Sequence, residues 1–264
     1  MSKLLLNRRR LLGLGAASAS TLLLAGCDQF DWASDQSNGA RQFLTQANDI
    51  TYRVQRLLLG ANALAPEYTE ADIRQGMRPN GSTDPQTPDY LAVKANNFAS
   101  YKLQITGLVN TPLSFSLADL KAMSARTQIT RHDCVEGWSC IAKWKGPQLG
   151  PILDQAGIKP DAKYCLYHCY DVMDDGSLSG GSPYYETSDL FDAHHPQTIL
   201  AYGMNDMDLP VANGAPIRVR IERALGYKQP KYVHTIELVS DYSHIGAGKG
   251  GYWEDLGYTW YGGI

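Results

Sequence analysis

The sequence predicts a β-rich α+β fold, and three observations support this prediction. Beyond residue 100 the apolar segments are mostly short runs rich in β-branched and aromatic residues, separated by turn-forming residues. Few segments have helical spacing, and strands and helices do not alternate as they do in parallel α/β proteins. The chain of 264 residues, 44% of them hydrophobic, is long enough for one sizeable core or two small ones. Its net charge of −3 argues against a nucleic-acid partner, which would require a basic surface.

Residues 1–27 have the pattern of an export signal. Arg8, Arg9 and Arg10 precede an apolar stretch at 11–25 that is shorter than the roughly twenty residues of a transmembrane helix. The arginines followed by two leucines resemble a twin-arginine signal, a route that carries folded proteins and often cofactor proteins. LAGC at 24–27 resembles the lipobox of bacterial lipoproteins, with Cys27 as the acylated residue. We therefore expect a periplasmic protein anchored to the inner membrane by lipid on Cys27; the alternative is an ordinary signal peptide with an incidental cysteine.

Two segments are expected between the signal and the main domain. Residues 28–40 are polar and flexible in composition and predict a tether. Residues 41–95 begin with apolar residues at spacings of three and four, which predict an amphipathic helix over 41–59. Prolines interrupt the part at 65–90, which predicts an irregular segment wrapped on a surface.

Residues 96–264 contain the expected regular structure of the main domain. Ser116 is a typical cap for a helix at 116–123, and Gly157 is a typical end for a helix within 147–158. Short strands are predicted at 101–109, 127–134, 162–171, 198–204, 215–222 and 231–240.

Cys134, in RHDCVEGWSCIAKW at 131–144, is the principal candidate for chemistry. From the residues alone it is a candidate disulfide partner, zinc ligand, catalytic nucleophile or ligand to a soft metal. Cys134 and Cys140 are not spaced like the close pairs of structural zinc sites, although an exported protein permits a disulfide between them. Cys165 and Cys169 would lie about 13 Å apart on one strand face, too far for a direct bond. Nothing in the local sequence supports a thiol hydrolase.

A glycine-rich stretch, HIGAGKGG at 244–251, contains the pattern Gly-x-Gly-x-x-Gly. A dinucleotide or phosphate site would require a βαβ unit around it, and no such unit follows. A flexible loop is therefore the better interpretation.

Several motifs in order resemble the sulfite-oxidase-type molybdoenzymes. CVEGWS at 134–139 is followed by W-x-G-x-x-L-x-x-I-L at 144–153, and this pair is most similar to the periplasmic methionine-sulfoxide reductase branch. The other motifs are NNF at 96–98, ITGLVNTPLSFSLADL at 105–120, NGAPIR at 213–218 and LGYK at 225–228. Together they cover roughly residues 90–240. The resemblance implies a mixed, β-rich sulfite-oxidase-type molybdopterin-binding fold.

The resemblance also implies a Mo-molybdopterin cofactor and its ligands. Cys134 would be the metal ligand and the catalytic residue, because a thiolate suits a soft metal. Arginine and lysine side chains suit the cofactor phosphate. The residues implied to complete the cofactor site are Asn96, Cys169, Asn213, Arg218, Lys228 and Lys231.

The sequence departs from both branches of this family near the substrate. Sulfite oxidases carry an arginine shortly after the metal cysteine, within a Cys-Ala-Gly-Asn-Arg pattern, whereas the fifth position after Cys134 in this chain is Ser139, preceded by Trp138. This difference makes sulfite a less favoured substrate, because a dianion needs paired cations. The tryptophan-containing segment of the sulfoxide reductases is replaced here by residues 222–230. Substrate identity therefore does not carry over from either branch.

The predicted function is two-electron oxygen-atom transfer on a small-molecule substrate, with a separate redox partner. The chain contains no Cys-x-x-Cys-His haem motif and too few grouped cysteines for an iron–sulfur cluster. A membrane b-type or periplasmic c-type cytochrome is the expected partner. The alternative is a cofactor-binding or structural lipoprotein without turnover.

Overall fold

The computed structural model describes residues 38–60, 62–74, 76–173 and 181–264. The chain forms two compact units, residues 1–51 and 52–264. The export signal, Cys27 and most of the expected tether lie outside the described residues. The predicted division into 28–40, 41–95 and 96–264 stays a prediction. Among the described residues, no helix has both the length and the hydropathy needed to cross a membrane.

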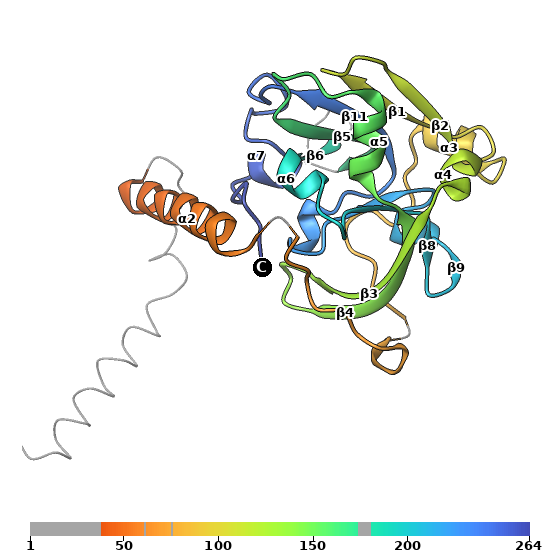
Figure 1. The fold of residues 1–264 in the computed structure, drawn as a ribbon, viewed down its shortest axis with the longest axis horizontal. Helices are drawn as coiled ribbons and strands as arrows, with labels where there is room; N and C mark the ends of the chain where they lie inside the picture. The colour runs from red at the N-terminus through yellow and green to blue at the C-terminus, as the bar shows by residue number, and fades with distance from the viewer. Residues whose placement is uncertain (1–37, 61, 75, 174–180) are drawn as a thin grey trace, which may run out of the picture. The chain divides into compact units, whose positions relative to one another are not determined.

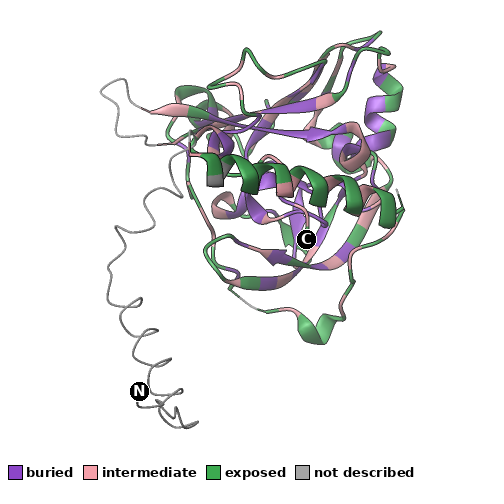
Figure 2. Cartoon of the chain, turned by 90° about the vertical axis from the view of Figure 1, so that its left-hand side faces the viewer, coloured by how far each residue is buried: buried purple, intermediate pink, exposed green. Residues whose placement is uncertain are grey.

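The helix predicted over 41–59 is present as α2 (Gly39–Leu58), which begins in the first unit and ends in the second. In the first unit, Thr51 Oγ1 donates a hydrogen bond to the carbonyl of Ala47 at 3.0 Å, one helical turn earlier. Figure 2 shows exposed or intermediate burial along most of this helix. The proline-rich part that follows is irregular, as predicted, except for η2 (Glu70–Asp72) and the start of α3 (Pro88–Lys94).

A five-stranded mixed sheet forms the larger part of the second unit (Figure 1). Its order is β2-β1-β11-β5-β6, and only β1 and β11 are parallel. The strands are β1 (Lys102–Gly107), β2 (Leu113–Ser116), β5 (Tyr164–Met173), β6 (Ser182–Asp189) and β11 (Val233–Val239). Apolar side chains of β1, β5 and β11 form the main core with α5 (Leu149–Ala156).

A second sheet, β3-β4-β8-β9, lies on the other side of the unit in Figure 1. It consists of β3 (Ala125–Asp133), β4 (Ser139–Pro147), β8 (Gly203–Met204) and β9 (Met207–Asp208). Antiparallel β7 (Ile199–Ala201) and β10 (Arg218–Arg220) form a short ladder. A smaller core around Trp144 joins this ladder to the second sheet. The remaining helices are α4 (Leu117–Ala122), α6 (Leu190–Ala193), η3 (Val211–Asn213), η4 (Gly226–Lys228) and α7 (Tyr252–Asp255).

The local signals for helix ends are confirmed. The Ser116 side chain accepts a hydrogen bond from the backbone N–H of Asp119, which is a capping-box contact at the start of α4. Gly157 ends α5 with a φ of 70°, a conformation that glycine adopts without strain. The stretch at 244–251 is a loop, as predicted, and it contains Gly246, Gly248 and Gly250 at positive φ.

The strand predictions were correct in position but incomplete. The predicted strand at 198–204 is two strands, β7 and β8, and the one at 215–222 is reduced to β10. β2, β4, β6 and β9 were missed. β4 alternates buried and less buried residues through Cys140, Ala142 and Trp144, so its period of two was present in the sequence. β6 contains buried Glu186, whose polarity hides the strand.

Candidate cofactor site

Cys134 lies at the first position after β3, in the tight connection to β4. Its N–H donates to the carbonyl of Trp138 at 2.9 Å, and its own carbonyl accepts from the N–H of Gly137 at 3.0 Å. Gly137 has a φ of 85°, so this turn favours glycine for its backbone conformation. The long β3–β4 ladder ends with the pair Asp133 and Ser139, which holds both ends of the turn. The turn therefore fixes the position of the Cys134 thiol.

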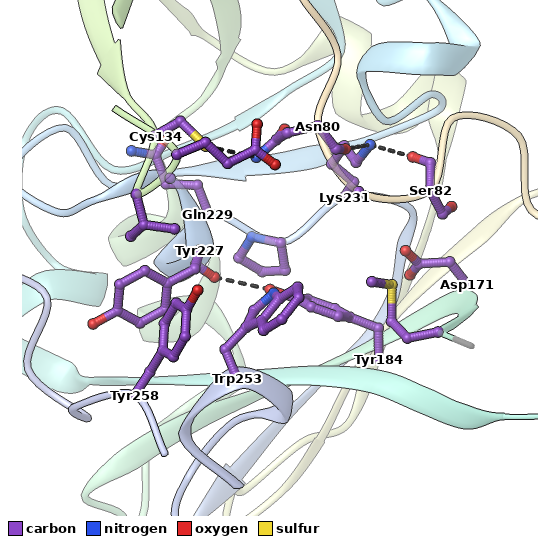
Figure 3. Close-up of a pocket in the computed structure, with 16 residues that line it drawn as sticks. Asn80, Ser82, Cys134, Asp171, Tyr184, Tyr227, Gln229, Lys231, Trp253 and Tyr258 are labelled. Atoms are coloured by element: carbon purple, nitrogen blue, oxygen red, sulfur yellow. Dashed lines mark hydrogen bonds between the residues drawn. The ribbon is translucent and has the colours of Figure 1, made fainter. Parts of the chain in front are cut away.

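The thiol of Cys134 is buried and lines a pocket formed by five separate segments (Figure 3). These segments come from the region before α3, the β3–β4 turn, the ends of β5 and β6, the region of η4, and the C-terminal part around α7. The lining residues are Asn80, Gly81, Ser82, Cys134, Val135, Glu136, Asp171, Met173, Tyr184, Gly226, Tyr227, Gln229, Pro230, Lys231, Trp253 and Tyr258.

Asn80 and Lys231 meet Cys134 on one side of this pocket. The Asn80 Nδ2 donates to the Cys134 Sγ at 3.8 Å. The Lys231 Nζ donates to the carbonyls of Asn80 at 2.6 Å and Ala212 at 3.2 Å, and also to that of Ser82. Lys231 therefore holds the segment at 80–82 against the site, and Asn80 is placed to donate a hydrogen bond to a thiolate.

Burial shifts the pKa values of Lys231 and Asp171. Burial and the nearby Arg218 guanidinium lower the pKa of Lys231 to about 7, although the carboxylate of Asp171 opposes this effect. Burial raises the pKa of Asp171 to about 6. The Asp171 Oδ1 is buried and has no hydrogen-bond partner among the described residues. The pocket that Cys134 lines thus also holds a weakly basic amine and a weakly acidic carboxyl group.

Arg218 is a second cation next to this site, and only 1% of it is exposed. Its guanidinium donates to the carbonyls of Asn213 at 3.1 Å and Gln229 at 3.3 Å, and its Nε has no partner among the described residues. A β-carbon at Gly214 would lie 3.0 Å from the Lys231 Cβ and 3.2 Å from the Arg218 Cβ, so both basic side chains begin beside Gly214. Burial and the neighbouring Arg220 lower the pKa of Arg218 to about 9.

Arg220, in the same strand, is a buried cation whose charge is paired within the protein. It donates to Glu222 at 2.7 and 3.0 Å and to the His132 Nδ1 at 2.8 Å. Burial, followed by Arg220, lowers the pKa of His132 well below its ordinary value, so the ring is neutral and its Nδ1 accepts this hydrogen bond. The His132 ring packs against Gly226, where a β-carbon would come within 2.6 Å of the Nε2. Gly226 is therefore required for close packing beneath the Cys134 turn.

The structure brings four of the predicted cofactor residues near one another. Cys134, Asn213, Arg218 and Lys231 are all buried around the pocket, and the Asn213 Nδ2 is a further donor without a partner among the described residues. Cys169 is buried in β5, where burial raises the pKa of its thiol well above the ordinary value. Cys169 therefore contributes backbone and packing rather than a thiolate.

Two predicted residues have their polar groups directed elsewhere. The exposed Asn96 follows α3, does not line the pocket, and donates through Nδ2 to the Ser100 Oγ at 2.8 Å. Lys228 is buried between Glu186 and Glu254, with Nζ–oxygen distances of 2.5 and 2.6 Å. These two carboxylates raise the pKa of Lys228 above its ordinary value despite burial, which acts in the opposite direction. The roles of Asn96 and Lys228 in cofactor binding stay predictions.

The sequence interpretation missed Asn80, Asp171 and the aromatic wall of the pocket. Asn80 belongs to a proline- and glycine-rich stretch that was assigned only a wrapping role. Asp171 was recognisable as an acid at the end of an apolar strand segment. Trp253 and Tyr258 are near the C-terminal end of the described chain, and no local signal connects them to Cys134.

The other cysteine alternatives can be compared with this arrangement. Cys134, Cys140, Cys165 and Cys169 are free thiols, so the structure does not contain the disulfide considered for Cys134 and Cys140. Within the described part of the chain, no group of three or more His, Cys, Asp and Glu residues is arranged to hold a metal ion.

The residues present fit an anionic cofactor that carries a soft metal. A thiol that lines a pocket supplies one soft ligand, and Arg218 and Lys231 are buried cations without an ion-pair partner among the described residues. A β-rich domain with this site defines the class of oxidoreductases that bind a metal-containing organic cofactor.

Comparison with known proteins identifies the family within this class. A family model described as the oxidoreductase molybdopterin binding domain matches residues 90–245, and the chain belongs to this family. The protein is therefore a molybdenum-dependent oxidoreductase that binds the molybdopterin cofactor. When bound, this cofactor supplies two-electron redox chemistry at the metal.

Three relatives illustrate the range of similarity. The chain is 34% identical over 256 residues to a putative protein-methionine-sulfoxide reductase subunit YedZ1 of Azospira oryzae, covering 97% of this chain and 87% of the relative. It is 32% identical over 187 residues to the protein-methionine-sulfoxide reductase catalytic subunit MsrP of Xanthomonas campestris, covering 68% of this chain and 54% of that protein. The chain thus spans about half the length of this catalytic subunit. The crystal structure of the sulfane dehydrogenase SoxCD from Paracoccus pantotrophus matches with a TM-score of 0.46 and 20% identity, covering 54% of this chain and 39% of that one.

Proposed function

We propose that this protein reduces a sulfoxide-type substrate by oxygen-atom transfer in the bacterial periplasm, at a molybdopterin cofactor held by Cys134. The observation that carries the proposal is the position of the Cys134 thiol, which lines the pocket beside Lys231 and near Arg218. The similarity to proteins named methionine-sulfoxide reductase subunits supports the direction of the reaction.

In this proposal each group near Cys134 has a distinct role. Cys134 binds the metal, and the Asn80 amide stabilises its thiolate by donating a hydrogen bond. Arg218 and Lys231 bind the cofactor phosphate, since a desolvated cation binds a phosphate oxygen more strongly than in water. The unpaired Nδ2 of Asn213 and the backbone near Cys169 bind the pterin. Asn96 and Lys228 are included among the cofactor-binding residues only because the family resemblance implies this role.

The opposite wall of the pocket favours a neutral sulfur compound over sulfite. Tyr227, Trp253 and Tyr258 form a connected aromatic group, with ring centroids 5.4 Å apart in both the Tyr227–Tyr258 and the Trp253–Tyr258 pair (Figure 3). Sulfur–aromatic contacts each stabilise by about 0.3–1.5 kcal/mol, which suits a thioether or its sulfoxide. Among the described lining residues Lys231 is the only lysine or arginine. A sulfite dianion would therefore lack the paired cations that it needs.

The two protons of sulfoxide reduction require groups that titrate near neutral pH. Asp171, with a pKa of about 6, lines the pocket and meets this requirement. The electrons come from a separate protein, for which a membrane b-type or a periplasmic c-type cytochrome is the fitting class. Lipid on Cys27 and the tether at 28–40 would keep the enzyme near such a carrier and raise the effective concentration of the pair.

The proposal is tested on protein exported by a molybdenum-competent host. We expect molybdenum and pterin in a ratio near one to the protein, and reduction of methionine sulfoxide by a reduced viologen dye. N-oxides and sulfite are the comparison substrates. Bound cofactor without turnover of any of them would favour the non-catalytic alternative, and oxidation of sulfite faster than reduction of any sulfoxide would reverse the substrate assignment.

The location is tested separately by fractionation and mass spectrometry. We expect a lipid on Cys27 and recovery with the inner membrane, and Cys27→Ala should remove the lipid. A mature wild-type protein that is wholly soluble in the periplasm and carries no lipid would contradict the anchor while leaving the redox chemistry untouched.

A further inference from the structure

The helix α2 has an apolar face that nothing in the described part of the chain covers. In its last two turns, Leu57 is 83% exposed and Leu58 is 74% exposed, and Val54 is exposed as well. The same spacing of three and four continues back along the helix to Ile50 and Phe43, of which Phe43 is 69% exposed. At 100° per residue these side chains form one stripe along the helix.

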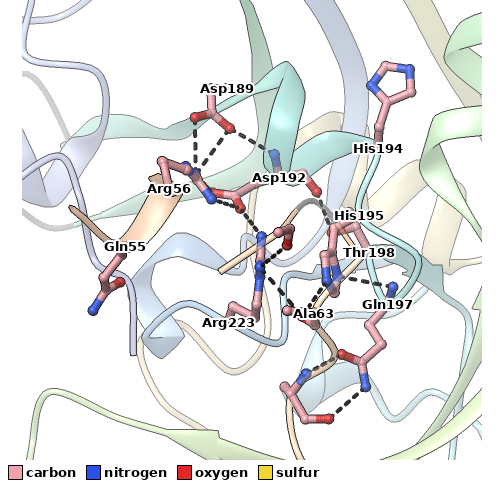
Figure 4. A network of polar contacts seen from close by, with 12 residues as sticks. Gln55, Arg56, Ala63, Asp189, Asp192, His194, His195, Gln197, Thr198 and Arg223 are labelled. Atoms are coloured by element: carbon pink, nitrogen blue, oxygen red, sulfur yellow. Dashed lines mark hydrogen bonds and ion pairs between the residues drawn. The ribbon is translucent and has the colours of Figure 1, made fainter. Parts of the chain in front are cut away.

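Within the second unit, the last turns of this helix contact the rest of the unit through polar side chains (Figure 4). The Tyr52 hydroxyl donates to the Asp189 Oδ2 at 2.9 Å. Arg56 forms ion pairs with Asp189 at 3.1 Å and Asp192 at 2.5 Å, and its guanidinium lies 4.3 Å from the centre of the Phe191 ring.

These contacts fix the orientation of the last part of the helix, which belongs to the second unit. The polar residues at 52 and 56 are about 100–160° around the helix from Val54, Leu57 and Leu58, so their contacts turn these three side chains away from the core. An ordinary surface helix has the reverse arrangement, with its apolar stripe packed on the protein and its polar side in water. A stripe of this size left exposed indicates a binding surface.

The chain before α2 indicates which surface covers the stripe. Only residues 28–38 separate Cys27 from the first residue of α2, and an extended chain of that length spans at most about 40 Å. A lipid on Cys27 would therefore keep the helix within reach of the bilayer that holds the lipid. In the stretch from residue 38 to residue 60, Arg56 is paired with Asp189 and Asp192, and the other two arginines outnumber the one aspartate, an excess of positive charge that favours anionic headgroups.

We propose that α2 is an interfacial helix, whose apolar stripe enters an anionic phospholipid bilayer while Tyr52 and Arg56 join it to the catalytic unit. The inference rests on the membrane tether proposed above, and it adds a second attachment that a flexible tether does not provide. The tether limits distance, whereas the helix would also fix which side of the catalytic unit faces the membrane.

The test measures the depth of individual helix positions in a membrane. Single cysteines are introduced as Ile50→Cys, Leu57→Cys and Asp49→Cys in the full mature protein, and each is labelled with an environment-sensitive fluorophore. The described native cysteines are all buried, which directs the label to the new position. The protein is then bound to vesicles of phosphatidylethanolamine and phosphatidylglycerol that contain spin-labelled lipid.

We expect strong quenching at positions 50 and 57 and at least about threefold weaker quenching at position 49, the matched control on the polar side of the helix. The double substitution Leu57→Ser and Leu58→Ser should abolish quenching at position 50. Turnover with a soluble viologen dye should not change, because the stripe does not line the cofactor pocket.

The other outcomes overturn the proposal in recognisable ways. Equal or absent quenching at all three positions would exclude an inserted stripe. A blue-shifted label in the absence of lipid, together with a dimer in sedimentation, would show that a second copy covers the stripe. Shielding that appears only after addition of the membrane redox partner would assign the stripe to that protein. Mass spectrometry for lipid on Cys27 and the viologen assay, run on the same samples, separate each of these results from a failure of the tether or of the enzyme activity.

Discussion

Substitution of Arg218 by methionine separates a cofactor contact from a structural ion pair. Arg218 and Arg220 are both buried in β10, two residues apart. Arg220 has Glu222 as a partner at 2.7 Å, whereas Arg218 has no carboxylate within ion-pair distance among the described residues. Arg220→Met is therefore the matched control, with the same change of side chain in the same strand.

The expected effects follow from these partners. In cofactor-free protein, Arg218→Met removes two hydrogen bonds to carbonyls, worth about 1.5–3 kcal/mol each, and also removes an uncompensated buried charge that is several kcal/mol unfavourable. We expect these effects to leave the free energy of unfolding within about 2 kcal/mol of wild type. Arg220→Met leaves Glu222 buried and unpaired, and it should reduce the free energy of unfolding by about 3–5 kcal/mol.

For cofactor retention we expect the opposite order, with a larger loss of cofactor in Arg218→Met than in Arg220→Met. Loss of a buried contact with a phosphate weakens binding by about 2–5 kcal/mol, which corresponds to roughly 30-fold to several thousandfold. Bound cofactor stabilises the wild-type fold by mass action, and Arg218→Met should lose most of that stabilisation.

The assay combines urea unfolding of the cofactor-free and the cofactor-bound protein with molybdenum analysis after extensive dialysis. The reasoning would be refuted if Arg218→Met retained as much molybdenum as wild type. It would also be refuted if cofactor-free Arg218→Met were destabilised as much as Arg220→Met, because Arg218 would then be a structural residue.

Three further predictions concern the metal ligand, the acid beside it and the export signal. Cys134→Ser should reduce turnover by more than about 100-fold in a folded protein, because serine is a harder metal ligand than cysteine. The control Cys140→Ser should retain most activity. Equal losses of activity in the two variants would support a two-cysteine site. The pKa of Asp171 is about 6 in the folded state and 3.8 in the unfolded state, so the folded state binds the proton more tightly. This difference contributes about 3 kcal/mol to the free energy of unfolding below pH 3.8, and the contribution is lost as the pH rises to about 6. Urea unfolding of the cofactor-free protein between those pH values should show this loss in wild type and not in Asp171→Asn, and parallel curves would contradict the buried, protonated carboxyl. Replacement of Arg8 and Arg9 by lysine should stop export, which fractionation would detect, because the change keeps the charge and loses the guanidinium geometry.

The features that the sequence predicts correctly depend on near neighbours. The Ser116 cap, the Gly157 helix end and the α2 stripe each arise from residues within a few positions of one another. The Cys134 turn is also local, since its two hydrogen bonds span at most four residues. For these features, residue propensity and hydrophobic periodicity reflect the local interactions that determine the structure.

The features that the sequence did not predict depend on distant pairing. β1 pairs in parallel with β11, more than a hundred residues later, and no local signal encodes this register. Asn80 and Asn96 are both asparagines in turn-rich stretches, yet only Asn80 reaches Cys134, because Lys231 holds its segment by three carbonyls. The role of Asn96, which the family resemblance implies through a three-residue motif, stays a prediction.

Buried charge distinguishes the cofactor site from the rest of the core. Arg220 and Lys228 are buried beside carboxylates at 2.5–2.7 Å, so their charges are compensated within the protein. The hydrogen bonds found for Arg218 and Lys231 among the described residues all go to carbonyl oxygens, and burial lowers the pKa of each. Uncompensated buried cations destabilise a fold by several kcal/mol, so their presence beside a pocket is explained best by an anion that binds there. The molybdopterin phosphate proposed above is such an anion, whereas the charge of Lys228 is already compensated within the protein by Glu186 and Glu254.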